Sequence, residues 1–245
     1  MARPKKIQDT TGTIVIPDPI KIGLRSGGVV TIAGEFVDVS QLTLNDIAYG
    51  LANIPRFSGQ MDRPYSVCEH SIILSELCGD DYNQAIAALF HDTAECLGIG
   101  DINTFLKSDD MRDLEDRINK EVTKKFKVPD FVRHDLDKQL GNYEACTIHP
   151  AKGHFGTAEP LPVRYRHYRS ISDCAEAWKT LYQVYLDSRE FSQLPIPVGG
   201  LRPNVPFSIQ DLYSRYPGIL PSAVKKALEL NPTIRNAGGD NYVLQ

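Results

Sequence analysis

The chain has 245 residues, of which 42% are hydrophobic and 24% are charged, and its formal net charge is −4. This length can bury a full hydrophobic core, so we expect one main domain with an appendage. The acidic balance gives no strong nucleic-acid signal, because nonspecific nucleic-acid binding needs a basic surface, although it is compatible with a focused site for one anion.

The cysteines and the hydropathy pattern indicate the compartment. The five cysteines are scattered and form no CxxC pair, which is typical of reduced thiols in a cytosolic protein. No apolar stretch approaches the roughly 20 residues that a membrane-spanning helix requires. The basic residues near Met1 precede no hydrophobic segment, so we expect no signal peptide. We therefore expect a cytoplasmic protein without a membrane partner.

Residues 1–42 combine irregular stretches with short strands. Residues 13–16 predict one strand, and residues 29–32 and 36–39 predict a small hairpin around Gly34. A helix begins after this segment, where Thr43 is a suitable N-cap.

Helical periodicity then dominates the chain. Between residues 109 and 127 the apolar positions recur at three- and four-residue steps. Comparable patterns predict six helices, at residues 44–52, 67–77, 83–97, 109–127, 131–148 and 172–189. Residues 149–170 are rich in Pro, Gly, Arg and Tyr and indicate a long loop. The fold class predicted for residues 43–190 is therefore a compact all-α bundle.

The composition changes at Phe191. Residues 194–200 are typical of a linker, short helices are expected at 209–213 and 221–230, and a Gly/Asn-rich tail follows from Asn236. We divide the chain into an irregular and β segment at 1–42, a helical domain at 43–190, and a linker with a short helical extension at 191–245. The sequence gives this extension no role.

The most informative stretch is residues 90–95. His91 and Asp92 end an apolar run, and Glu95 follows within one helical turn. If the helix continues through this stretch, Glu95 lies on the same face as both residues. A His-Asp dipeptide alone is common by chance, so its meaning depends on what else lies nearby.

Two more residues could complete a metal-binding shell. His70 lies 21 residues before His91, and Asp137 lies 45 residues after Asp92. Asp135 competes with Asp137 for the last place, and we prefer Asp137. Two His and two Asp suit manganese, iron, cobalt or zinc better than calcium and leave positions open for water and substrate.

A bound ion of this kind acidifies water and polarises a phosphoryl oxygen. Further charged residues could act on a substrate that binds beside the ion. Glu95 and Asp101 are candidates to hold or deprotonate the water. Arg56 could meet a phosphate with its planar fork, and Lys107 could add a point charge. Each residue taken singly is more often an ordinary surface or core residue, so only the combination is informative.

In series, these motifs closely resemble the HD-domain metal-dependent phosphohydrolases. Within that family the chain looks most like the bacterial and phage branch of 5′-deoxynucleotidases and deoxynucleoside triphosphate triphosphohydrolases. The resemblance covers about residues 40–190. The matching segments are 46–51 with 56–59, 65–71 around His70, 88–95 around the His-Asp pair, 100–107, and Asp137 in register with Glu144.

The resemblance implies a compact helical HD-domain bundle that assembles as a dimer or a larger homo-oligomer. It implies one divalent transition metal, namely zinc, cobalt or manganese, with magnesium as a further candidate. The implied metal ligands are His70, His91, Asp92 and Asp137. The implied catalytic carboxylates are Glu95, as acid/base or water-orienting group, and Asp101. The implied substrate contacts are Arg56, Phe57 and Lys107.

The function implied is hydrolysis of a deoxynucleotide, either dNMP or dNTP, to the deoxynucleoside plus phosphate or triphosphate. The implied location is the cytoplasm of a bacterium or a phage-infected host. Two alternatives stay open: a cyclic-nucleotide or alarmone hydrolase on the same scaffold, and a non-catalytic nucleotide- or DNA-associated binding module. A basic cluster could extend the positive charge of the site far enough to bind a triphosphate, although a solvated basic loop is the simpler interpretation. The members of this cluster are Arg164, Arg166, His167 and Arg169.

Overall fold

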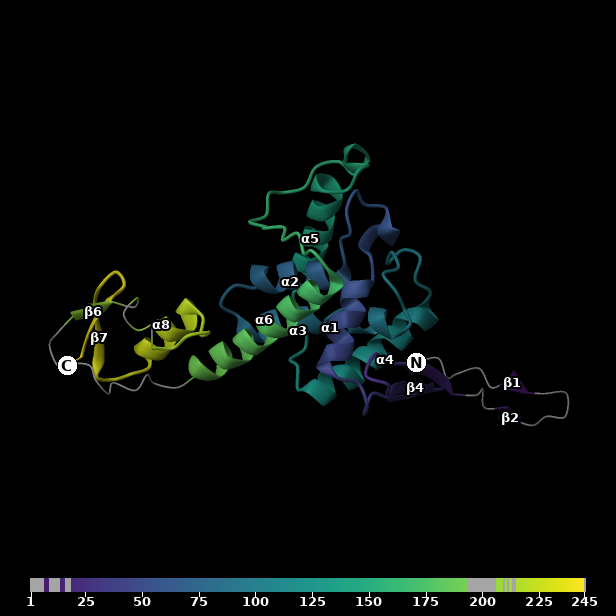
Figure 1. Ribbon diagram of the computed structural model, residues 1–245, viewed down its shortest axis with the longest axis horizontal. Helices are drawn as coiled ribbons and strands as arrows, with labels where there is room; N and C mark the ends of the chain where they lie inside the picture. Colours follow the sequence, from purple (N-terminus) through teal and green to yellow (C-terminus); the bar gives the residue numbers. More distant parts are fainter. Residues whose placement is uncertain are drawn as a thin grey trace.

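The computed structural model describes residues 19–193, 206–208 and 215–244, with residues 210 and 212 and the paired two-residue strands β1 (Ile7–Gln8) and β2 (Ile14–Val15). Over these residues the fold is predominantly helical (Figure 1). The described residues also form two three-stranded antiparallel sheets. One sheet comes before the helical core in the sequence, and the other comes after it. The helical middle and the N-terminal strands agree with the prediction, whereas the C-terminal sheet was not expected, so the fold is predominantly helical but not purely all-α.

The first sheet contains strands β3 (Ile20–Gly23), β4 (Val29–Ala33) and β5 (Phe36–Asp38), in that order. The hairpin expected around Gly34 is confirmed as β4–β5. Strand β3 was not predicted, because it has only four residues and most of its side chains are exposed. Alternate side chains of β4 enter the main core of the helices, so this sheet is not a separate unit.

Five of the six predicted helices are confirmed within three residues at each end. They are α1 (Leu44–Asn53), α2 (Val67–Leu77), α4 (Asp109–Phe126), α5 (His134–Thr147) and α6 (Ile171–Phe191). Side-chain caps explain the starts of most of them: in each case an oxygen accepts a backbone N–H three residues later. These caps are Thr43, Ser66, Ser108 and Ser170.

The sixth predicted helix, at 83–97, is wrong. Helix α3 (Tyr82–Phe90) ends before His91, Asp92 has non-helical dihedrals, and a 3₁₀-helix η2 (Thr93–Leu97) follows. The side chain of Asn119 on α4 bridges the break, because it donates to the carbonyl of His91 (3.2 Å) and accepts the N–H of Ala94 (3.1 Å). Helical periodicity therefore does not place Glu95 on the same face as His91 and Asp92.

Trp178 of α6 is the centre of the core. It is 0% exposed, its indole N–H donates to the carbonyl of Leu89 (3.0 Å), and its ring lies 5.0 Å from that of Phe90 and 5.9 Å from that of Tyr182. Helix α6 crosses α1 and α3 (Figure 1). This packing fixes the end of α3 immediately before His91.

The second sheet belongs to a C-terminal unit. It contains β6 (Pro206–Ser208), β7 (Ile234–Gly238) and β8 (Asn241–Leu244), and it packs with α8 (Pro221–Glu229). The helix expected at 221–230 is thus confirmed, whereas the Gly/Asn-rich tail forms a hairpin instead of an irregular end. The expected linker at 194–200 and helix at 209–213 lie outside the described residues, apart from residues 210 and 212.

Two further features concern the whole described chain. All five cysteines are free thiols. Of the helices that the structure describes, none has both the length and the apolar character that crossing a membrane requires.

Replacing Trp178 with Ala should lower the free energy of unfolding by about 3–5 kcal/mol, because it removes a fully buried indole. Urea unfolding followed by circular dichroism measures this loss. The control is Phe105→Ala, since Phe105 is 95% exposed and its loss should change stability by less than about 0.5 kcal/mol. Equal effects of the two substitutions would show that α6 does not organise the core.

Candidate metal centre

Four side chains from separate parts of the chain meet at one point. His70 comes from α2, His91 and Asp92 from the break after α3, and Asp137 from the first turn of α5. Ligand atoms of His70, His91 and Asp92 lie within 4.8 Å of one another. Asp137 Oδ1 lies 3.0 Å from Nε2 of His70 and 3.7 Å from Nε2 of His91. The structure therefore brings all four sequence-predicted ligands together.

Asp135, the competing candidate, lies elsewhere. Its side chain is exposed, and its carboxylate is 3.5 Å from Nε of Arg133. Asp135 and Asp137 are two positions apart on α5, so their side chains point about 200° apart around the helix axis. Only Asp137 therefore faces the histidines.

The two imidazole rings present the same nitrogen to the cluster. Nδ1 of His91 lies 2.8 Å from the carbonyl of Ala88, and Nδ1 of His70 lies 2.7 Å from Oε1 of Glu144. Each Nδ1 is thus the donor, which directs the lone pair of Nε2 inward. Nε2 of His91 is buried and lies 2.9 Å from Oδ2 of Asp92 and 3.7 Å from Oδ1 of Asp137, although neither contact has the geometry of a hydrogen bond. Two imidazoles and two carboxylates with this orientation fit a divalent transition metal ion.

The electrostatics of these groups agree with a cation site. Burial lowers the pKa of His91, but Asp92 and Asp137 outweigh it and raise that pKa well above its usual value. Burial raises the pKa of Asp137, but the neighbouring imidazoles of His70 and His91 outweigh it and lower that pKa strongly. The carboxylates thus attract positive charge to the centre of the cluster. A divalent cation would supply this charge while both histidines stay neutral.

Glu144 of α5 orients the first histidine. Its fully buried carboxylate accepts hydrogen bonds from Nδ1 of His70 (2.7 Å), the hydroxyl of Tyr65 (2.6 Å) and Nη2 of Arg56 (2.9 Å). Burial would raise the pKa of Glu144, but Arg56 and His70 lower it to about 2. From the sequence, Glu144 was noted only for its register with Asp137, and Tyr65 was given no role. The hydrogen bonds that these two residues make depend on the folded structure and leave no local signal in the sequence.

Arg56, Phe57 and Asp101 form a neighbouring group. Oδ2 of Asp101 accepts the N–H of Phe57 (3.0 Å), and its Oδ1 lies 3.8 Å from Nη1 of Arg56. Phe57 and Ser58 both have a φ of 53°, in the left-handed region that non-glycine residues rarely adopt. The Asp101 contact thus holds the strained 3₁₀-turn η1 (Arg56–Gly59) in place.

Glu95 is a buried carboxylate beside the cluster. Burial, Asp92 and Asp101 raise its pKa to about 9, and its Oε2 has no hydrogen-bond partner among the described residues. A bound cation would lower this pKa. Lys107 Nζ lies 3.9 Å from Oε1 of Glu95, but it bonds more closely to Glu115 on α4, at 2.7 Å. This Lys107–Glu115 pair has no signal in the sequence, because the two residues meet only in the folded chain.

A cleft of about 590 Å³ opens beside the cluster. His91, Asp92 and Asp137 line one part of it, and the other lining residues come from α3, the segment 104–107, α4 and residues 129–134. This volume suits a small organic ligand. Lys107 is among the lining residues, whereas Arg56, Phe57, Glu95 and Asp101 are not. Of the predicted substrate contacts, only Lys107 faces the cleft.

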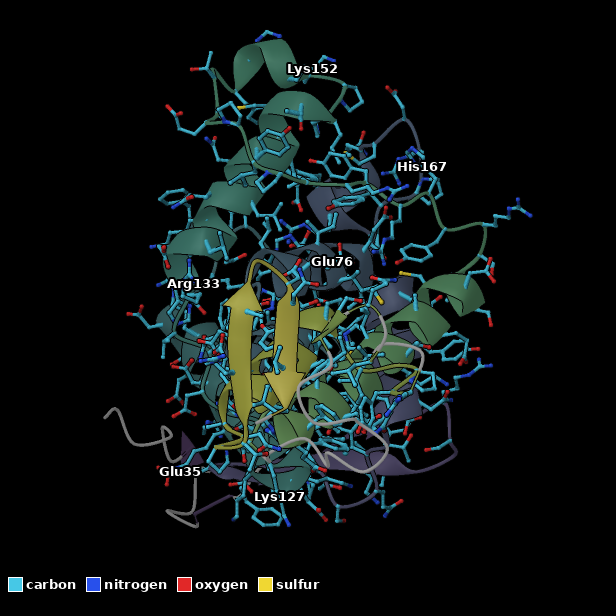
Figure 2. The ribbon with its side chains drawn as sticks, turned by 90° about the vertical axis from the view of Figure 1, so that its left-hand side faces the viewer. Glu35, Glu76, Lys127, Arg133, Lys152 and His167 are labelled. Carbon is cyan, nitrogen blue, oxygen red and sulfur yellow. The ribbon has the colours of Figure 1, made fainter. Side chains whose placement is uncertain are left out.

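The basic cluster of Arg164, Arg166, His167 and Arg169 does not border the large cleft. Arg166 pairs with Glu76 at 2.5 Å, and Arg164 lines a separate small pocket of about 150 Å³ with the same residue. Figure 2 labels Glu76 near the centre of the view and His167 above it, to the right. None of these four basic residues lines the large cleft. They therefore do not belong to the candidate site.

Comparisons with known proteins give limited matches. No family model matches the chain. The uncharacterized protein YfdR of Escherichia coli is 33% identical over 95 residues, which cover 38% of this chain and 52% of YfdR. An uncharacterized protein of Rhodobacter capsulatus is 36% identical over 98 residues, which cover 36% of this chain and 50% of that protein. The chain spans about half the length of the curated relatives it matches, so function is inferred from the site itself.

Replacing Asp137 with Asn should remove metal-dependent stabilisation, because it deletes a ligand charge. In the parent protein, free Mn²⁺ at about 100 times its dissociation constant should contribute about 2.7 kcal/mol and raise Tm by about 5–10 °C. Thermal unfolding with and without metal measures the shift. The matched control, Asp135→Asn, should retain it; equal shifts in both variants would remove Asp137 from the shell.

Replacing Glu144 with Gln should weaken metal binding about 10–100-fold, because His70 loses the carboxylate that orients it. Competition with a chelator of known affinity measures the change. Glu115→Gln is the control, since Glu115 lines the cleft but contacts neither histidine, and its affinity should match the parent protein. An unchanged affinity in Glu144→Gln would mean that this carboxylate only supports the fold.

Proposed function

We propose that the protein is a metal-dependent phosphohydrolase of the HD-domain type that acts on deoxynucleotides. The observation that supports this most is the meeting of His70, His91, Asp92 and Asp137 beside the buried, unliganded carboxylate of Glu95. A structural metal site would not need an open cleft on one side, and this cluster has one.

When bound, the metal would polarise the phosphoryl group and acidify water. His70, His91, Asp92 and Asp137 would hold this ion. Glu95 takes a proton from the attacking water as the new P–O bond forms and returns a proton to the leaving oxygen as the old P–O bond breaks. The contact of Asp101 with the Phe57 N–H supports a positioning role for this carboxylate.

The charges of the cleft favour a substrate with few phosphates. Apart from the metal ligands, the cleft is lined by three side chains of Lys or Arg and three carboxylates; these are Lys107, Arg112 and Lys120, and Glu115, Asp116 and Asp130. A triphosphate would need a larger surplus of positive charge. We therefore propose a deoxynucleoside monophosphate in preference to a triphosphate.

Replacing Glu95 with Gln should lower kcat at least about 100-fold, because the group that moves the proton is lost, while metal content stays unchanged. Phosphate release and chromatography of the products measure the rate with Mn²⁺, Co²⁺, Zn²⁺ and Mg²⁺. The substrates are mono- and triphosphates of deoxy- and ribonucleosides, cyclic nucleotides and an alarmone. Glu121→Gln, on the far turn of α4, is the control and should match the parent rate.

Two outcomes would contradict the proposal. Turnover at the parent rate in Glu95→Gln would remove this carboxylate from the chemistry. A metal-loaded protein that hydrolyses none of these compounds would show that the site is not a phosphohydrolase centre.

A further inference from the structure

The segment between α4 and α5 gives the cleft an apolar wall. Phe131 and Pro129 line the cleft here, whereas the lining residues that α4 supplies are all polar or charged. Phe131 is half-buried and packs against the main core, so part of its ring is open to the cleft. Phe90, the other phenylalanine of the lining, is 2% exposed and packs against Trp178 and Tyr182. Phe131 is therefore the phenylalanine that a ligand in the cleft can contact.

The ring of Phe131 lies next to the candidate metal centre. Its centroid is 5.1 Å from that of His91, at an interplanar angle of 45°, and it is 5.3 Å from that of His134 in an edge-to-face contact. Both histidines also line the cleft. A ligand that is bound to the metal at one end would therefore have its next ring beside Phe131.

Gln84 of α3 holds the backbone around Phe131 in place. Its amide oxygen accepts the N–H of Val132 (3.0 Å), and its amide N–H donates to the carbonyl of Asp130 (3.0 Å). These two hydrogen bonds come from one buried side chain, and they fix the backbone on both sides of Phe131. A group that is fixed before its ligand arrives loses less entropy on binding, so this ring is suited to a stacking contact.

Phe57, the aromatic substrate contact that the family resemblance implies, is placed differently. Its ring makes an edge-to-face contact with His149, with 5.3 Å between the centroids, and the guanidinium of Arg56 lies 5.5 Å from its centroid. Phe57 does not line the cleft. A base that binds in the cleft therefore needs another aromatic surface, and Phe131 supplies one.

We propose that Phe131 is the surface on which the base of the nucleotide stacks. This inference rests on the proposed function, because a phosphate at the metal places the base one sugar ring away, beside Phe131. Every base has a π face, so stacking on an aromatic side chain tolerates different bases. Phe131 thus favours nucleotides over sugar phosphates that lack a base, and it does not favour one base over another.

The test is isothermal titration calorimetry of the Mn²⁺-loaded full chain with a phosphonate analogue of dAMP, in which a methylene group replaces the 5′ oxygen and prevents hydrolysis. The parent protein should bind this analogue. Phe131→Ala should raise the dissociation constant about tenfold, because the stacking contact is lost. Phe131→Tyr keeps the ring and should bind the analogue as tightly as the parent protein does.

Inorganic phosphate is the second ligand, because it lacks a base. Its affinity should be the same in Phe131→Ala as in the parent protein, which would also show that the metal site of the variant is intact. The matched control is Phe36→Ala, which removes a phenylalanine that is 62% exposed on β5 and outside the lining of the cleft. Both of its affinities should equal those of the parent protein.

Three results would overturn the role of Phe131. The parent protein does not bind the analogue, or Phe131→Ala binds it as tightly as the parent protein, or Phe131→Ala loses affinity for phosphate by the same factor, because the ring would then act only through His91. Failure of the proposed function gives a different result: the analogue binds as expected, but the protein hydrolyses no nucleotide.

Discussion

The buried carboxylate of Glu144 is the interaction on which the rest of the site depends. An uncompensated charge in such a place would cost several kcal/mol, and here three donors from η1, α2 and the segment before it satisfy the carboxylate. The same contacts tie α5, which carries Asp137, to α2, which carries His70. One carboxylate therefore sets both the orientation of the His70 imidazole, a candidate metal ligand, and the spacing of two helices.

The break after α3 is the second constraint. Adjacent residues on a continuous helix point about 100° apart. His91 and Asp92 can meet at one point because α3 ends at Phe90, Asp92 has non-helical dihedrals and a 3₁₀-helix begins at Thr93. Asn119 satisfies the backbone groups that the break leaves, and Trp178 fixes the helix that precedes it. The candidate chemistry thus rests on a local departure from regular structure that two distant side chains maintain.

Much of this architecture is predictable from the sequence, and the limits have physical causes. Apolar periodicity predicts the bounds of five helices because this signal is local, and Thr43 also marks the start of α1. The break at His91 is not predictable in this way, since Asn119 comes from another helix, and the pairing of Lys107 with Glu115 is likewise tertiary. The C-terminal sheet was missed because its strands are short and interrupted by Gly and Asn. The order of the motifs did identify the four residues that the fold brings together.

The central claim is that these four side chains hold one divalent cation. The most direct measurement is anomalous X-ray diffraction from crystals of the protein grown with Mn²⁺. The account predicts a single strong anomalous peak about 2.0–2.3 Å from Nε2 of His70, Nε2 of His91 and an oxygen of both Asp92 and Asp137. A peak elsewhere, or no peak in crystals that contain saturating Mn²⁺, would contradict it.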